Sequence, residues 1–163
     1  MRITGRDGVV FELRPVEWQF PAGTGYWDDL WLIVEGRVDL GERSWSFRDP
    51  ALTITNARWL AYWLRQAAAG QVAPIDAEDT GGHGRRGIIF SEPALSFTLL
   101  ERRQGEATVR AHFYAEAAPP WLNAGGGASV GLDVDFVLDL DQLTRAADEW
   151  TRDLDELPPR QQP

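Results

Sequence analysis

A chain of 163 residues with 44% hydrophobic and 25% charged residues matches one ordinary globular domain, which excludes a disordered or fibrous protein. It contains no cysteine, so disulfides and thiolate metal sites are excluded, and a reducing cytoplasm is the expected location. The net charge of −9 repels phosphate backbones and argues against nucleic-acid binding, whereas it attracts a basic protein partner.

The N-terminal third alternates between apolar and polar residues with a period of two. An Asp-Gly pair at residues 7–8 predicts a hairpin between two such segments. The alternation continues over residues 30–40, with Gly36 as a possible bulge, and resumes over residues 43–48 after a second turn. These segments predict antiparallel strands.

The first helix is expected after this second hairpin. Thr53 or Thr55 is a suitable N-cap, apolar residues follow at helical spacing, and Gly70 stands where a helix ends. Residues 71–86 are rich in Pro, Asp and Gly without periodicity, which predicts a flexible loop.

The C-terminal half repeats the strand pattern and closes with a helix. We expect strands over residues 87–90, 95–102, 107–116 and 130–139. An amphipathic segment then begins near Asp141 and is stopped by the prolines at 158 and 159.

These elements predict an α+β fold, mainly an antiparallel sheet of seven to eight short strands with two amphipathic helices packed on it. We expect a single domain over residues 1–163 with a disordered tail at 159–163. No stretch approaches the roughly 18 apolar residues of a membrane span, so no membrane contact is expected.

The sequence contains none of the common catalytic, phosphate-binding or metal-binding motifs. Only two histidines are present: His83 lies in the glycine-rich part of the predicted loop, and His112 lies on the polar side of a predicted strand, where a solvated role is expected. We therefore expect no catalytic residues, no metal ligands and no cofactor. A run of glycines at 125–127 lacks the lysine of a phosphate-binding loop and is interpreted as a plain loop.

One internal echo leaves two interpretations open. Residues 47–54 and 90–97 share the order aromatic, acid, proline, apolar, hydroxyl. The acids, Asp49 and Glu92, precede proline and are suited to accept backbone N–H bonds in a turn. Alternatively, they form a carboxylate pair for acid–base chemistry, which requires a separation of about 5–10 Å.

Tryptophan is the other unusual feature of the composition. The eight are Trp18, Trp27, Trp31, Trp45, Trp59, Trp63, Trp121 and Trp150. Trp45 and Trp150 lie on apolar faces and are expected in the core. Trp27 and Trp121 lie in segments that resemble loops, where an exposed aromatic ring can anchor a protein interface or stack on a sugar.

Acidic residues concentrate near the C-terminus. Asp133, Asp135 and Asp139 alternate with apolar residues in the last predicted strand, so their carboxylates share one face. Arg110 on the preceding strand is the obvious internal cation. These three acids, with Trp27 and Trp121, form the predicted partner-binding set.

Several short motifs, in order and spacing, resemble the WapI-type immunity proteins along nearly the whole chain. They are WLIVEG at 31–36, WSFRDP at 45–50, FSEPALSF at 90–97, EAAPPW at 116–121 and LPPR at 157–160. The resemblance implies a small cytoplasmic antitoxin that binds and neutralises a cognate bacterial toxin.

Two hypotheses follow. The first is a non-catalytic immunity protein that binds a basic toxin domain through an acidic surface. The alternative is a carbohydrate-binding or hydrolytic domain that uses exposed tryptophans and the carboxylates of Asp49 and Glu92.

Overall fold

Within the residues that the structure describes, the chain forms two antiparallel four-stranded sheets and two α-helices, which confirms the α+β class. The computed structural model describes residues 1–76, 87–92, 94–122 and 131–160. His83 and the glycine run at 125–127 lie outside the described residues, as do most of the predicted loop at 71–86 and the last three residues of the predicted tail. The single predicted sheet is in fact two sheets.

The first sheet has the strand order β1-β2-β3-β4, so each strand pairs with its neighbour in sequence. The predicted hairpin turn lies between β1 and β2, where Gly8 adopts a φ of +87° and Val9 N–H donates to the Asp7 carboxylate at 3.1 Å. The strands are β1 (Arg2–Thr4), β2 (Val10–Trp18), β3 (Trp31–Asp39) and β4 (Ser44–Thr53).

Strand β4 runs five residues beyond the predicted end. The strand lies at the edge of the sheet and has no neighbour among the described strands on its open side. Pro50 lacks an N–H group, but no hydrogen bond to a further strand is lost there. Asp49 consequently lies within a strand, opposite Val34, and not in the turn that was expected.

Gly36 is not at a bulge. It pairs in regular register with Leu13 and Phe47, while the irregularities of the sheet lie elsewhere. A Cβ atom at residue 36 would lie 2.0 Å from the ring of Phe47. The glycine therefore leaves room for that aromatic ring, which the alternation pattern alone did not indicate.

The second sheet has the order β5-β6-β7-β8 and is also fully antiparallel. Its strands are β5 (Ile88–Ile89), β6 (Leu95–Arg103), β7 (Glu106–Phe113) and β8 (Leu132–Asp139). A turn of 3₁₀ helix at Ala115–Ala117 ends the extended run that was predicted to continue to residue 116.

Both helices begin at side-chain caps. Helix α1 (Ile54–Ala68) begins after Thr53, whose hydroxyl accepts from Asn56 N–H at 3.1 Å, and Gly70 follows its end with a φ of +75°. Helix α2 (Leu140–Asp155) begins immediately after β8, one residue earlier than predicted. Neither helix is long and apolar enough to cross a membrane.

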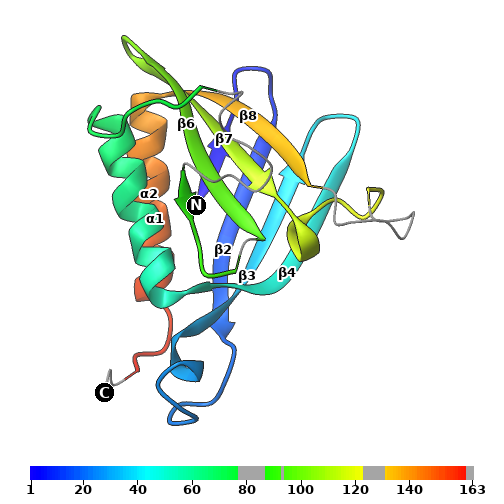
Figure 1. Cartoon of the computed structure of the whole chain (residues 1–163), viewed down its shortest axis with the longest axis vertical. Coiled ribbons are helices and arrows are strands. Elements are labelled where there is room, and N and C mark those ends of the chain that lie inside the picture. The colour runs from blue at the N-terminus through cyan, green and yellow to red at the C-terminus, as the bar shows by residue number, and fades with distance from the viewer. Residues whose placement is uncertain (77–86, 93, 123–130, 161–163) are drawn as a thin grey trace.

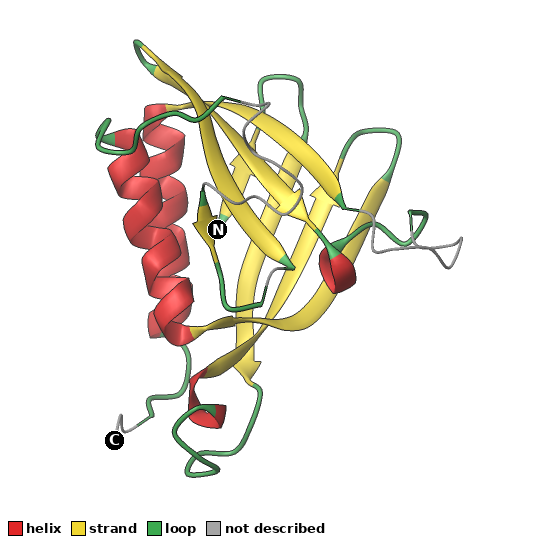
Figure 2. Ribbon diagram, in the orientation of Figure 1, coloured by secondary structure: helices red, strands yellow, loops and turns green. Residues whose placement is uncertain are grey.

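The two sheets lie across one another, and the paired helices lie along one side of them (Figure 1, Figure 2). Phe11 of the first sheet meets three rings of the second, with centroid distances of 5.1–6.4 Å to Phe97, Phe113 and Phe136. Trp150 is fully buried, and its indole N–H donates to the Ala57 carbonyl of α1 at 2.7 Å. One continuous core therefore joins both sheets and both helices.

Candidate functional site

The acidic row of β8 points outward from the second sheet. Asp133, Asp135 and Asp139 are exposed and alternate with buried apolar residues, as the sequence pattern predicts. Register with β7 places His112 opposite Asp133 and Arg110 opposite Asp135. These neighbours determine how much of the negative charge is offset within the fold.

Arg110 holds Asp135 with two hydrogen bonds. Its Nε lies 2.7 Å and its Nη2 2.9 Å from the carboxylate oxygens, and its Nη1 lies 3.9 Å from Asp133. The hydrogen bond to Asp135 raises the pKa of Arg110, and the nearby negative charges act in the same direction. The expected internal cation is therefore fully engaged.

His112 is buried, with 1% of its surface exposed, and the predicted solvated role is wrong. Its Nε2 lies 3.0 Å from the Thr98 hydroxyl and its Nδ1 2.8 Å from the Asp133 carboxylate. The ring of Tyr114 stacks beside it at 6.3 Å, and the Tyr114 hydroxyl donates to Asp133. Neighbouring strands and this ring cover the imidazole, which alternation within one strand cannot show.

The chain from Thr98 through His112 to Asp133 has the order hydroxyl, imidazole, carboxylate that hydrolases use. Thr98, however, has no exposed surface. The backbone of Gly87 lies against it, since a Cβ there would fall 2.7 Å from the Thr98 hydroxyl and 1.8 Å from the Phe97 carbonyl. No substrate atom has room to approach this hydroxyl. The three side chains therefore form a buried structural network.

Asp139 is the N-cap of α2. Its carboxylate accepts from Gln142 N–H at 2.7 Å, and its own N–H donates to the Gln142 side chain at 3.2 Å. Arg145 lies 3.6 Å from the same carboxylate. This capping box gives Asp139 a structural role that the Asp-x-x-Gln spacing could have indicated.

Asp49 and Glu92 line one pocket of about 400 Å³, which we call the carboxylate pocket. Asp28 and Glu116 line it as well, and Phe20 and Trp31 contribute aromatic walls. Sequence reasoning missed Asp28 and Glu116 because the four acids come from four separate segments, and only the echo around proline links two of them.

The carboxylates of this pocket differ from those of β8 in their charged neighbours. Within the described part of the chain, no arginine forms an ion pair with Asp28, Asp49, Glu92 or Glu116. Partial burial raises the pKa of Asp49, and repulsion from Glu116 and Glu92 raises it further. Among the described residues, no group of three acids or histidines converges closely enough to hold a metal ion.

A second cavity, of about 720 Å³, is also lined by an acid, Glu35. In contrast to the acids of the carboxylate pocket, Glu35 has cationic partners among the described residues. Glu35 lies between Arg14, at 3.2 Å, and Arg48. The hydrogen bond from Arg48 is the largest cause of a lowered pKa at Glu35. Here the fold neutralises its own carboxylate.

The tryptophans divide into core and surface residues. Trp45, Trp63 and Trp150 are buried, as predicted for Trp45 and Trp150. Trp121 is half-buried against Trp45, with ring centroids 5.5 Å apart. Trp27 is 74% exposed.

Two aromatic surfaces stand out from this division. Trp27 packs edge-to-face on Tyr26, which is itself 60% exposed, with centroids 5.1 Å apart. We call these two residues the aromatic tip. On helix α1, Trp59 is 50% exposed. Tyr26 was not singled out from sequence because nothing in the pattern separated it from other loop residues.

The five residues of the predicted partner-binding set do not form one patch. Trp27 lies in the loop between β2 and β3, at the end of the molecule near the C-terminus, while Asp139 lies where β8 meets α2 at the opposite end (Figure 1).

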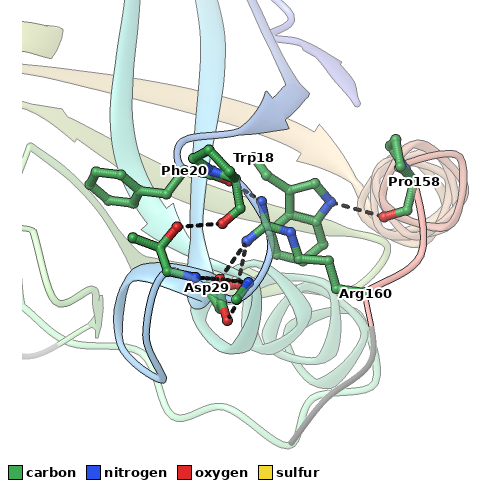
Figure 3. A network of polar contacts seen from close by, with 8 residues as sticks. Trp18, Phe20, Asp29, Pro158 and Arg160 are labelled. Carbon is green, nitrogen blue, oxygen red and sulfur yellow. Dashed lines mark hydrogen bonds and ion pairs between the residues drawn. The ribbon is translucent and has the colours of Figure 1, made fainter.

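Arg160 binds the β2–β3 loop to the C-terminal segment (Figure 3). Its guanidinium donates to the backbone carbonyls of Phe20 and Asp29 and to the Asp29 carboxylate, and it stacks 4.4 Å from the Trp18 ring. The Trp18 indole N–H donates to the Pro158 carbonyl at 2.9 Å. The expected tail at 159–163 is therefore anchored at Arg160, and residues 161–163 lie outside the described part of the chain.

Comparison with known families gives one match: the model of the immunity protein WapI-like family matches residues 2–158. No match was found among curated proteins or among solved structures.

Proposed function

Because the chain belongs to the immunity protein WapI-like family, we propose that it binds and neutralises a cognate bacterial toxin in the cytoplasm, without catalysis of its own. The observation that carries this proposal is the family match over residues 2–158. The net charge of −9 favours a basic partner, because opposite charges accelerate association and select against acidic competitors.

The proposed contact is an acidic surface with aromatic anchors. Asp133, Asp135 and Asp139 supply an exposed acidic row, and Trp27 and Trp121 are the predicted anchors. The exposure of these three acids supports a role in binding. Their hydrogen bonds and ion pairs within the fold, however, weaken their attraction for an external cation. The contact is therefore best tested in two parts, the β8 row and the β2–β3 loop.

The test needs a candidate toxin, and the choice is the C-terminal toxin domain of a large protein, wherever a neighbouring gene is found to encode one. Expression of that domain alone in bacteria should arrest growth, and co-expression of this chain with it should restore growth. The two purified proteins should then form a stable complex whose association rate falls as salt rises. Growth arrest that this chain does not relieve would overturn the proposed function.

The carboxylate pocket favours a second candidate, the hydrolytic domain that uses Asp49 and Glu92. Two acids in one pocket, one with a raised pKa, fit a general acid paired with a base. The test is release of nitrophenol from a panel of nitrophenyl glycosides. Turnover that Asp49→Asn abolishes would establish the second candidate, and absence of turnover would dismiss it.

A further inference from the structure

The aromatic tip is the most exposed aromatic surface among the described residues. Tyr26 and Trp27 are more exposed than Trp59 or Tyr62, the other exposed rings. Leaving two large rings in water forfeits hydrophobic stabilisation that the same residues obtain in the core. Trp and Tyr are also the residues that most often dominate the energy of protein interfaces.

The loop that carries the tip is held in place from both sides. The Asp29 carboxylate accepts from Gly23 N–H at 3.0 Å and Thr24 N–H at 3.3 Å, which closes the loop on itself. Arg160 donates to the Asp29 backbone at 3.2 Å and stacks on Trp18 (Figure 3). A loop that is ordered before binding loses less conformational entropy when a partner docks.

The charge beside the tip indicates the chemistry of the occupant. Asp28 follows Trp27 directly and lines the carboxylate pocket with Asp49, Glu92 and Glu116. The raised pKa of Asp49 reflects burial and repulsion from two of these neighbours, a repulsion that an incoming arginine or lysine would relieve. The acids of β8, in contrast, already have Arg110 and the His112 network beside them.

We infer that the aromatic tip and the carboxylate pocket together form the docking surface for a basic protein domain, which inserts a cationic side chain into the pocket while its apolar surface covers Tyr26 and Trp27. Arg160 is a positioning residue: it holds the loop and does not contact the partner. This inference rests on the proposed function and specifies which surface performs it.

The experiment measures the affinity of the full chain for the candidate toxin domain defined under the proposed function, using matched pairs of variants. Trp27→Ala should weaken binding about 30-fold or more, as expected for a central aromatic residue of an interface. Trp59→Ala, which removes an exposed tryptophan from α1, should change it by less than about threefold. Both variants should retain the wild-type melting temperature.

The charge of the pocket is tested through the association rate. Glu92→Gln should slow association about threefold at low salt, and the difference should vanish at high salt. Glu42→Gln, an exposed acid in the β3–β4 turn, is the matched control and should leave the rate unchanged.

The role of Arg160 is tested by coupling. Arg160→Ala should weaken binding about tenfold and speed amide hydrogen exchange in residues 21–29, but it should add little once Trp27 is alanine. Arg152→Ala removes an exposed arginine of α2 and should do neither. Additive effects of Arg160→Ala and Trp27→Ala would overturn the positioning role.

The outcomes separate the two proposals. If wild-type protein binds and neutralises the domain but Trp27→Ala matches wild type, the docking surface lies elsewhere and this inference is wrong. Loss of binding in Trp59→Ala would then place it on α1. If wild-type protein neither binds nor neutralises the domain, the proposed function itself fails.

Discussion

The face of β8 and the carboxylate pocket are both acidic, but the fold treats them differently. On β8, Asp135 has the guanidinium of Arg110 at 2.7 Å and Asp133 has the His112 ring at 2.8 Å. In the pocket, partial burial raises the pKa of Asp49, and repulsion from Glu116 and Glu92 raises it further. Acids with internal partners contribute to stability, whereas acids without them reduce it unless an external cation is bound.

We expect the largest loss of stability from His112→Ala, because this change removes a buried ring together with its hydrogen bonds to the Thr98 hydroxyl and to the Asp133 carboxylate. We expect a loss of about 3 kcal/mol in the free energy of unfolding, measured by urea denaturation. Glu92→Gln in the pocket is the contrasting variant and should change stability by less than about 0.5 kcal/mol. Equal losses of unfolding free energy for the two variants would contradict the contrast drawn between the β8 face and the carboxylate pocket.

Arg110→Ala should cost less, since Asp135 is partly solvated and can rehydrate. We expect a loss of about 1.5 kcal/mol, in the range of hydrogen bonds to charged groups. A double-mutant cycle with Asp135→Asn should show positive coupling that weakens in high salt. Arg37→Ala, an exposed arginine of the first sheet, should leave stability nearly unchanged.

Asp139→Ala tests the third acid of the row. Loss of the capping box should lower stability by about 1 kcal/mol and lower the helical circular dichroism signal. Asp141→Ala, two residues further on, removes an acid without a capping bond and should cost only a few tenths of a kcal/mol. A larger effect at residue 141 would contradict the assigned cap.

Asp49→Asn should give the smallest effect, and with the opposite sign. A carboxyl whose pKa is raised in the folded state contributes stability that is complete below its ordinary value of 3.8 and is lost as pH rises through the raised pKa. At pH 7 the asparagine variant should therefore be slightly more stable than wild type, by about 0.5 kcal/mol or less. The advantage should disappear below pH 3.8, and an advantage that persists there would point to a cause other than charge.

Local patterns identified most elements correctly. The Asp-Gly hairpin, the cap at Thr53, the glycine end of α1 and the alternation of β8 depend on residues close in sequence, and the structure confirms each of them. The end of β4 was misjudged because proline is tolerated in a strand at an open edge or at a bulge, and neither strand order nor strand register is a local property.

The candidate sites needed more than local patterns. The echo around proline singled out Asp49 and Glu92, but only the fold brought Asp28 and Glu116 beside them. Alternation placed His112 on the polar side of β7, yet Thr98 and Asp133 on adjacent strands bury it.

The sequence by itself determined the α+β class and the surplus of negative charge, because composition fixes the charge and short periodicities fix which residues must leave water. Only the tertiary structure decided which acids are neutralised and which are not. The physical reason is that charge pairing acts over a few ångströms in space, and strand register, not distance along the chain, places Arg110 beside Asp135 and leaves Asp49 beside other acids.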